Sequence, residues 1–81
     1  MIELRLKEMI ANKMSKERRR ITMTEIANVT GISRMTLNRM VRNRSYNTVT
    51  DHLDKLCTFF ECRIEDLVRF VPSSNNKLDA A

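Results

Sequence analysis

One glycine and one proline, Gly31 and Pro72, are the only residues of these two turn-forming types in the 81-residue chain. Sandwiches and barrels of many short strands need such residues at most of their connections, because tight hairpin turns require positive φ angles. A single glycine and a single proline cannot supply those turns, so the sequence predicts an all-α fold. The length allows one small hydrophobic core and therefore one domain. We expect five short helices around this core and no strands.

Positive charge is concentrated in the middle third of the chain. The formal net charge is +5, but residues 16–44 alone carry eight basic and two acidic side chains, a net of +6. Most of these bases are arginines, whose planar forks match phosphates and guanine edges. The segment is either a solvated charged face or a surface for an anionic partner, with nucleic acid first and an acidic protein second. A membrane surface is disfavoured, because the bases do not line one face of a long amphipathic helix.

Helical spacing of apolar residues and two capping patterns outline the first three helices. The first is expected to begin at Ile2 and to end near Met14 or somewhat later. Residues 15–20, SKERRR, follow as a polar connector or as an exposed extension of that helix. Thr22 and Glu25 have the spacing of a capping box, in which the threonine accepts from the N3 amide while the glutamate reaches back. The second helix should therefore begin at about Met23.

Further capping and apolar patterns place the rest of the chain. The second helix should stop at Gly31, and Ser33 should cap a third helix with Leu37, Met40 and Val41 on its apolar face. A polar loop at 43–47 should follow. Thr48, with Asp51, is the expected cap of the fourth helix, whose apolar stripe is Val49, Leu53, Leu56, Cys57 and Phe60. A short last helix should carry Ile64, Leu67, Val68 and Val71 and close at Pro72. The domain would then span 1–72, with 73–81 as a flexible tail.

The glycine lies between two short amphipathic helices, and the residues at fixed distances from it in the sequence indicate how these helices pack. Ala27, four residues before Gly31, is small where two helices must cross closely. Leu37, six residues after it, is apolar where the second of these helices must pack back. Ile26, Ile32 and Met40 are expected to fill the remaining core positions. A small residue, a glycine turn and a buried aliphatic residue at these offsets build a helix-turn-helix.

Residues 24–40, TEIANVTGISRMTLNRM, resemble the helix-turn-helix of the Cro/phage-repressor-type (XRE-like) family of DNA-binding regulators. The resemblance covers residues 2–72 and extends to the run from Thr48 through DHLDKLCTFFECRIEDLVRFVP, which is similar to the small single-domain members. It implies a compact five-helix, lambda-repressor-like fold and a sequence-specific regulator of transcription, a repressor. It also implies double-stranded DNA as partner, a homodimer on a two-fold symmetric site, no cofactor, and a bacterial, phage or mobile-element context.

In such proteins the third helix enters the major groove. The residues implied to read bases are Arg34, Met35, Asn38 and Arg39. The residues implied to contact phosphates or the sugar backbone are Ser33, Thr36, Arg42, Arg44, Tyr46, Asn47, Arg18, Arg19 and Arg20. The spacing independently puts positions 34, 35, 38 and 42 on one helix face, opposite Leu37. For each of these residues the alternative to DNA contact is a helix cap or a solvent-exposed side chain that binds nothing.

Two positions depart from the family pattern. Met23 stands where many members have a glutamine that contacts a phosphate, and a methionine cannot donate that bond. Residues 15–20 lengthen the usual link between the first two helices. One hypothesis is that Arg18 to Arg20 replace the missing contact. The alternative is a solubilising loop that points away from DNA.

No constellation of catalytic or metal-binding residues is evident. Cys57 and Cys62 are expected to be small core residues, since a disulfide needs an oxidising compartment and His52 lies at a poor ligand spacing. We therefore expect no enzyme activity and no metal. Charged residues interrupt the N-terminal apolar pattern, and no apolar run can span a membrane, so we expect a cytoplasmic protein. The competing function is an antitoxin or an adaptor that uses the same fold to hold a protein partner.

Overall fold

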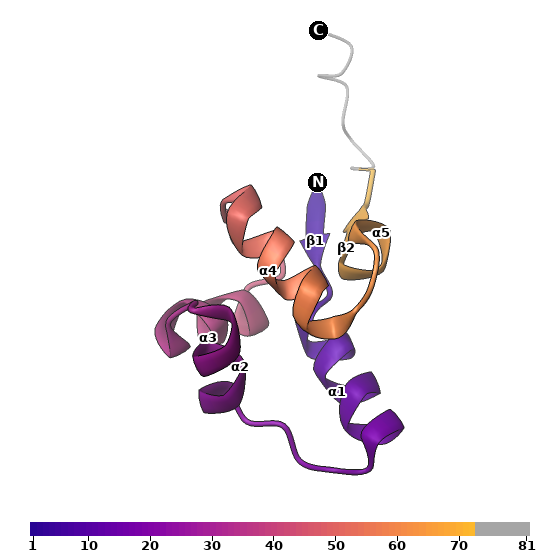
Figure 1. Ribbon diagram of the computed structural model, residues 1–81. Helices are drawn as coiled ribbons and strands as arrows, with labels where there is room; N and C mark the ends of the chain where they lie inside the picture. Colours follow the sequence, from indigo (N-terminus) through magenta and orange to yellow (C-terminus); the bar gives the residue numbers. More distant parts are fainter. Residues whose placement is uncertain (73–81) are drawn as a thin grey trace, which may run out of the picture.

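The computed structural model describes residues 1–72, and it contains five helices that form the body of the domain (Figure 1). The proposed tail, 73–81, lies outside the described residues, so the predicted domain boundary stays a prediction. The helices confirm the all-α class and the count expected from the sequence. Their bounds are α1 (Leu6–Glu17), α2 (Met23–Thr30), α3 (Arg34–Arg42), α4 (Thr50–Phe60) and α5 (Ile64–Leu67).

The expectation of no strands is wrong, because the two ends of the described chain pair as a small antiparallel sheet. Strand β1 (Ile2–Leu4) lies beside β2 (Val68–Phe70), with Ile2 opposite Phe70 and Leu4 opposite Val68. The first helix therefore begins at Leu6 and not at Ile2, and the last one ends at Leu67 and not near Val71. Alternation explains the error, since Ile2 and Leu4 place their side chains on one face of the sheet while helical spacing had joined Ile2 to Leu6.

Capping side chains define the starts of the two helices around the glycine. The Thr22 hydroxyl accepts from the Glu25 amide at 3.1 Å, and the Ser33 hydroxyl accepts from the Thr36 amide at 3.1 Å. Both caps were expected. The carboxylate of Glu25 does not reach back to complete the capping box, however, because it binds the guanidinium of Arg19 instead.

The expected cap of α4 is wrong by one residue. Val49 occupies the cap position, and the Thr48 hydroxyl bonds to His52 Nδ1 at 3.2 Å. Val49 was also expected in the apolar stripe, yet 58% of its surface is exposed, because the chain is still extended at this residue and has not yet entered the helix. Leu56 and Phe60 of that stripe are buried as expected.

The turn between α2 and α3 has the predicted left-handed residue. Gly31 has φ +79°, and its amide donates to the Ala27 carbonyl at 2.8 Å. Thr30 supports the turn in a way the sequence did not reveal. Its buried hydroxyl donates to the Ile26 carbonyl at 2.6 Å and accepts from the Ile32 amide at 3.2 Å. These bonds satisfy buried polar groups at the end of α2. They also link α2 to Ile32, the residue that follows the glycine turn.

One hydrophobic core joins all five helices to the sheet. Ile26 and Leu37 are completely buried on the facing sides of α2 and α3. The other buried apolar residues are Leu4, Leu6, Ile10, Ile21, Ile32, Met40, Leu56, Phe60 and Leu67. Burial of one face of α3 leaves its opposite face outward. Among residues 1–72, no helix is both long and apolar enough to cross a bilayer.

Candidate nucleic-acid interface

One face of α3 is exposed along the whole helix. Leu37 and Met40 anchor the buried face, and α3 packs on both α2 and α1. The structure places every residue implied to read bases on the outward face: Arg34, Met35, Asn38 and Arg39 are all exposed, with Met35 at 64%. Arg42 extends this face by one further turn. The face carries donors, an amide and an apolar tip, which are the groups that base edges bind.

The arginines of this face are held by no carboxylate in the described part of the chain. Neither Arg39 nor Arg42 forms an ion pair with any of residues 1–72, and Arg34 only approaches the Thr24 hydroxyl at 3.4 Å. A guanidinium that is already exposed and unpaired gives up no internal partner when it binds a phosphate or guanine. The face is therefore ready to bind an anionic surface.

Arg44, which is implied to contact phosphate, forms an ion pair within the molecule. Its guanidinium pairs with Glu8 on α1, while its carbonyl accepts from the Leu4 amide at 2.7 Å. The hydrogen bond from Arg44 is the main cause that lowers the pKa of the Glu8 carboxyl. Arg44 thus ties the segment after α3 to α1 and β1, and its charge is partly neutralised there.

This ion pair makes stability depend on acid. Because the pKa of Glu8 is lower in the folded than in the unfolded chain, the pair stabilises the fold above pH 4.5 and loses that contribution as the pH falls below it. We expect Glu8→Gln to reduce stability at pH 7 by up to about 1 kcal/mol, because solvent screens a pair whose side chains are 42% and 35% exposed. The melting temperature of Glu8→Gln should therefore fall less between pH 7 and pH 3 than that of the wild type.

Glu65→Gln is the matched control, because Glu65 meets Arg63 only at 3.6 Å and both side chains are largely exposed. Its pH profile should follow the wild type. Equal profiles for Glu8→Gln and the wild type would show that the Glu8–Arg44 pair does not contribute to folding.

The basic connector between α1 and α2 is divided between paired and unpaired arginines. Arg19 donates to both carboxylate oxygens of Glu25 at 2.8 Å, and its Nε donates to Glu17 at 2.8 Å. Lys13 joins the network by pairing with Glu17 at 2.7 Å. Arg19 lowers the pKa of Glu25, and Lys13 with Arg19 lowers that of Glu17. This network fixes the connector to the start of α2.

The neighbours of Arg19 have a different role in the structure. Arg18 and Arg20 are exposed and have no carboxylate partner within residues 1–72. Arg18 also closes α1, with φ +53° in the left-handed region. Both expectations for 15–20 hold in part, since α1 extends to Glu17 and the connector begins after it.

The packing of Met23 gives a reason for a methionine at this position. Its side chain is half-buried and packs against the core, so this position serves the interior of the domain. Thr24, the next residue, is exposed and lies within reach of Arg34 on α3. The first turn of α2 therefore presents Thr22 and Thr24 outward, and a hydroxyl can donate to a phosphate where a methionine cannot.

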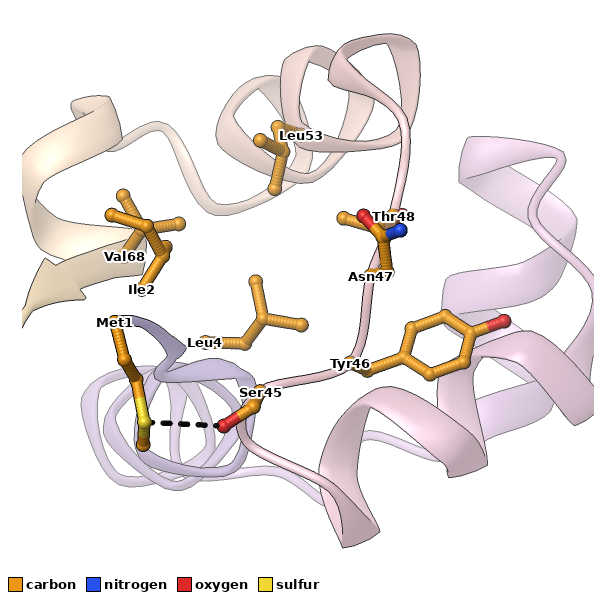
Figure 2. Close-up of a pocket in the computed structure, with 9 residues that line it drawn as sticks. All are labelled: Met1, Ile2, Leu4, Ser45, Tyr46, Asn47, Thr48, Leu53 and Val68. Carbon is orange, nitrogen blue, oxygen red and sulfur yellow. Dashed lines mark hydrogen bonds between the residues drawn. The ribbon is translucent and has the colours of Figure 1, made fainter. Parts of the chain in front are cut away.

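Four other residues implied to contact the backbone lie in or near α3. The Ser33 hydroxyl, besides capping, donates to Thr36 Oγ1 at 3.0 Å. Tyr46 is half-buried against the core, and Asn47 is exposed beside it. Figure 2 shows both in the segment that borders a hollow next to β1. The structure thus groups Ser33 and Thr36 at the start of α3 and Tyr46 and Asn47 beyond its end.

The two thiols are partly buried. Cys57 and Cys62 are free and half-buried, and burial raises the pKa of the Cys62 thiol to about 11. Cys62 is therefore protonated at neutral pH and is a poor nucleophile. Within residues 1–72, no three histidine, cysteine or acidic side chains gather as a metal site.

A family model described as a Cro/C1-type HTH DNA-binding domain matches residues 5–73, a span that includes all five helices. No curated protein matches the chain.

Proposed function

The chain belongs to the family of Cro/C1-type helix-turn-helix DNA-binding domains, and from this premise we propose that it is a sequence-specific transcriptional repressor that reads the major groove with α3. Membership in the family makes double-stranded DNA the partner and a DNA-binding regulator the class of protein. The finer proposal is supported by one observation above all. The outward face of α3 carries Arg34, Asn38, Arg39 and Arg42 without an internal carboxylate partner among the described residues.

Each side chain of this face has a chemical counterpart on a base edge. Arg34 and Arg39 can each form two hydrogen bonds with the O6 and N7 atoms of a guanine. Asn38 can pair in the same way with adenine, and Met35 can contact a thymine methyl group. A nine-residue helix is about 14 Å long, so its side chains can reach the edges of a few successive base pairs.

The proposed backbone contacts come from both ends of α3 and from the connector. Ser33 caps α3 and Thr36 lies in its first turn, Arg42 is its last residue and Asn47 follows it, and Arg18 and Arg20 belong to the connector. Arg19 and Arg44 support these contacts indirectly, because Arg19 holds the connector on α2 and Arg44 holds the end of α3 on α1. Either guanidinium would have to release or share its carboxylate to bind a phosphate, and an exposed pair of this kind contributes up to about 1 kcal/mol. We therefore propose Arg18 and Arg20, and not Arg19, as the phosphate-binding residues of the connector.

The double replacement Arg18→Gln/Arg20→Gln tests this division. Each phosphate contact contributes roughly 0.9 to the slope of log K against log salt, so the slope should flatten by up to about 1.8. The loss of affinity should be similar on every duplex sequence, because phosphate contacts carry no base information. Fluorescence anisotropy with a random-sequence duplex over a salt series measures both effects.

Arg19→Gln is the control in the same connector. It should lower the melting temperature slightly, by freeing Glu25 and Glu17, and should change the salt slope less than the double variant. A double variant with the wild-type salt slope would show that the connector points away from DNA.

The same titration on the unmodified chain tests the proposed function. The proposed cationic phosphate contacts are Arg18, Arg20 and Arg42, so the slope should be about −2.7. A slope near zero at all sequences would favour the competing function, an adaptor or antitoxin that holds a protein partner. Catalysis forms no part of the proposal: within residues 1–72, the one hydrogen bond of the His52 ring goes to Thr48 and not to a thiol.

A further inference from the structure

The chain has two cysteines, and the end of α4 brings them together. The helix closes at Glu61, which has φ +53° in the left-handed region, and the chain then turns towards α5 (Figure 1). The Glu61 amide donates to the Thr58 carbonyl at 3.3 Å, and the Cys62 amide donates to the Cys57 carbonyl at 3.0 Å. These two bonds define a Schellman motif, in which the residues at the positions of Cys57 and Cys62 commonly pack against each other.

The backbone bond between the two cysteines sets how far apart they can be. Standard bond lengths leave their α-carbons at most about 7 Å apart, a limit reached only if all the bonds were collinear. Disulfides span about 4.4–6.8 Å between α-carbons. A side-chain hydrogen bond also links Cys62 to Cys57. Rotation of the two side chains, without movement of α4, can therefore bring the sulfur atoms to bonding distance.

Both thiols can be reached from solvent, because each cysteine is only half-buried. Cys57 borders a surface hollow of about 430 Å³ that it shares with Asp54 and Ile64. Cys62 borders a second hollow, of about 290 Å³, between α1 and the end of α4. A small molecule can therefore approach either sulfur atom without unfolding the domain.

We propose that Cys57 and Cys62 form a site of reversible oxidation, at which a low-molecular-weight disulfide converts the two thiols into one intramolecular disulfide. The Cys57 thiolate attacks one sulfur of the small disulfide, a mixed disulfide forms, and the first small thiolate leaves. The Cys62 thiol then gives up its proton and attacks the Cys57 sulfur, so that the second small thiolate leaves. The protein loses two electrons and two protons, which the two released thiols carry away.

The surroundings of the thiols set the order of the two steps. Burial, and after it the neighbouring Cys57, raises the pKa of the Cys62 thiol to about 11, so Cys62 is the weaker nucleophile at neutral pH. Cys57 therefore takes the first step. The second step takes place within one molecule, where the two sulfur atoms are already neighbours, and the mixed disulfide on Cys57 should not accumulate.

Equilibration with reduced and oxidised glutathione tests the site. The chain is started both from the reduced and from the oxidised form, so that slow exchange cannot hide the outcome, and mass spectrometry after an acid quench counts free thiols. The wild type should lose both thiols together and hold no glutathione. Cys62→Ser should instead accumulate one glutathione on Cys57, because no second thiol displaces it.

Cys57→Ser/Thr58→Cys is the matched control, because it moves one thiol by a single residue. Thr58 is exposed and borders a different hollow, beside α2, while the loop to Cys62 keeps nearly the same length. Its ratio of disulfide to dithiol should be at least about tenfold lower than that of the wild type in the same glutathione mixture. Circular dichroism checks folding, and the wild-type chain unfolded in urea is a second reference with the same expected ratio.

The same preference must appear as stability of the oxidised chain. A tenfold preference for the disulfide in the folded over the unfolded chain corresponds to about 1.4 kcal/mol, which should raise the melting temperature by at least about 5 °C. A folded wild type that closes its disulfide no more readily than in urea would overturn the proposal. So would an oxidised chain that melts at or below the reduced one, or glutathione bound to both cysteines of the wild type. None of these measurements involves DNA, so their outcome is independent of the proposed function.

Discussion

Replacing Arg39 with alanine should cost about 1–3 kcal/mol of binding free energy on the preferred duplex, which is roughly a 5- to 150-fold rise in Kd. Arg39 is exposed on α3 and has no ion-pair partner within residues 1–72, so its guanidinium is free for a two-bond contact with a guanine. Loss of that contact should also relax the preference at one base position of each half-site. Titration of a panel of single-base variants of the duplex measures both effects.

Arg63→Ala controls for the loss of one positive charge. Arg63 precedes α5, its side chain is 82% exposed, and it lies outside the proposed DNA face. Its replacement should change affinity by less than about threefold and leave base preference intact. If Arg39→Ala weakened binding to preferred and random duplexes equally, Arg39 would contact only the phosphate backbone.

Replacing Gly31 with valine should lower the free energy of unfolding by about 1–3 kcal/mol. The cost comes from the backbone alone, because φ is +79° and a Cβ at this position would meet no atom within 4 Å. β-Branched residues are strongly disfavoured at positive φ. For a domain of this size, each kcal/mol shifts the melting temperature by about 4–8 °C, so a thermal melt resolves the effect.

Gly31→Asn is the control that separates the effect of the positive φ angle from the effect of replacing glycine with any other residue. Asparagine tolerates the left-handed region, so it should destabilise the domain less than valine does. Identical melting temperatures for Gly31→Val and the wild type would mean that this turn can relax to a negative φ angle.

Local signals explain why the helix-turn-helix could be predicted from the sequence. Thr22 and Ser33 act through hydrogen bonds to amides three residues away, and Gly31 acts through its own φ angle. Such features depend on a short stretch of chain, so the pattern of residues reports them directly. The exposed positions of α3 follow in turn, because burying Leu37 and Met40 orients the whole helix.

The strands could not be predicted in this way. Each has three residues, too few for alternation to be distinguished from helical spacing. What makes Ile2–Leu4 a strand is its pairing with Val68–Phe70 at the other end of the described chain, and the same pairing shortens α5. A partner so distant in sequence leaves no local signal.

The engaged arginines were missed for the same reason. Arg44 pairs with Glu8, 36 residues away, and only the packing of α1 beside α3 brings them together. Arg19 is nearer to Glu25, six residues on, but that contact requires the connector to fold back on α2. Counting basic residues therefore overestimates the number of guanidinium groups that have no carboxylate partner among the described residues.

The central claim is that α3 reads base pairs in the major groove of double-stranded DNA. Selection of bound duplexes from a random-sequence pool tests it most directly, because no operator has to be assumed. We predict enrichment of an inverted repeat whose half-sites are centred about 10 base pairs apart, or a multiple of that distance. A pool that stays random after repeated rounds, while the chain remains folded, would contradict the claim.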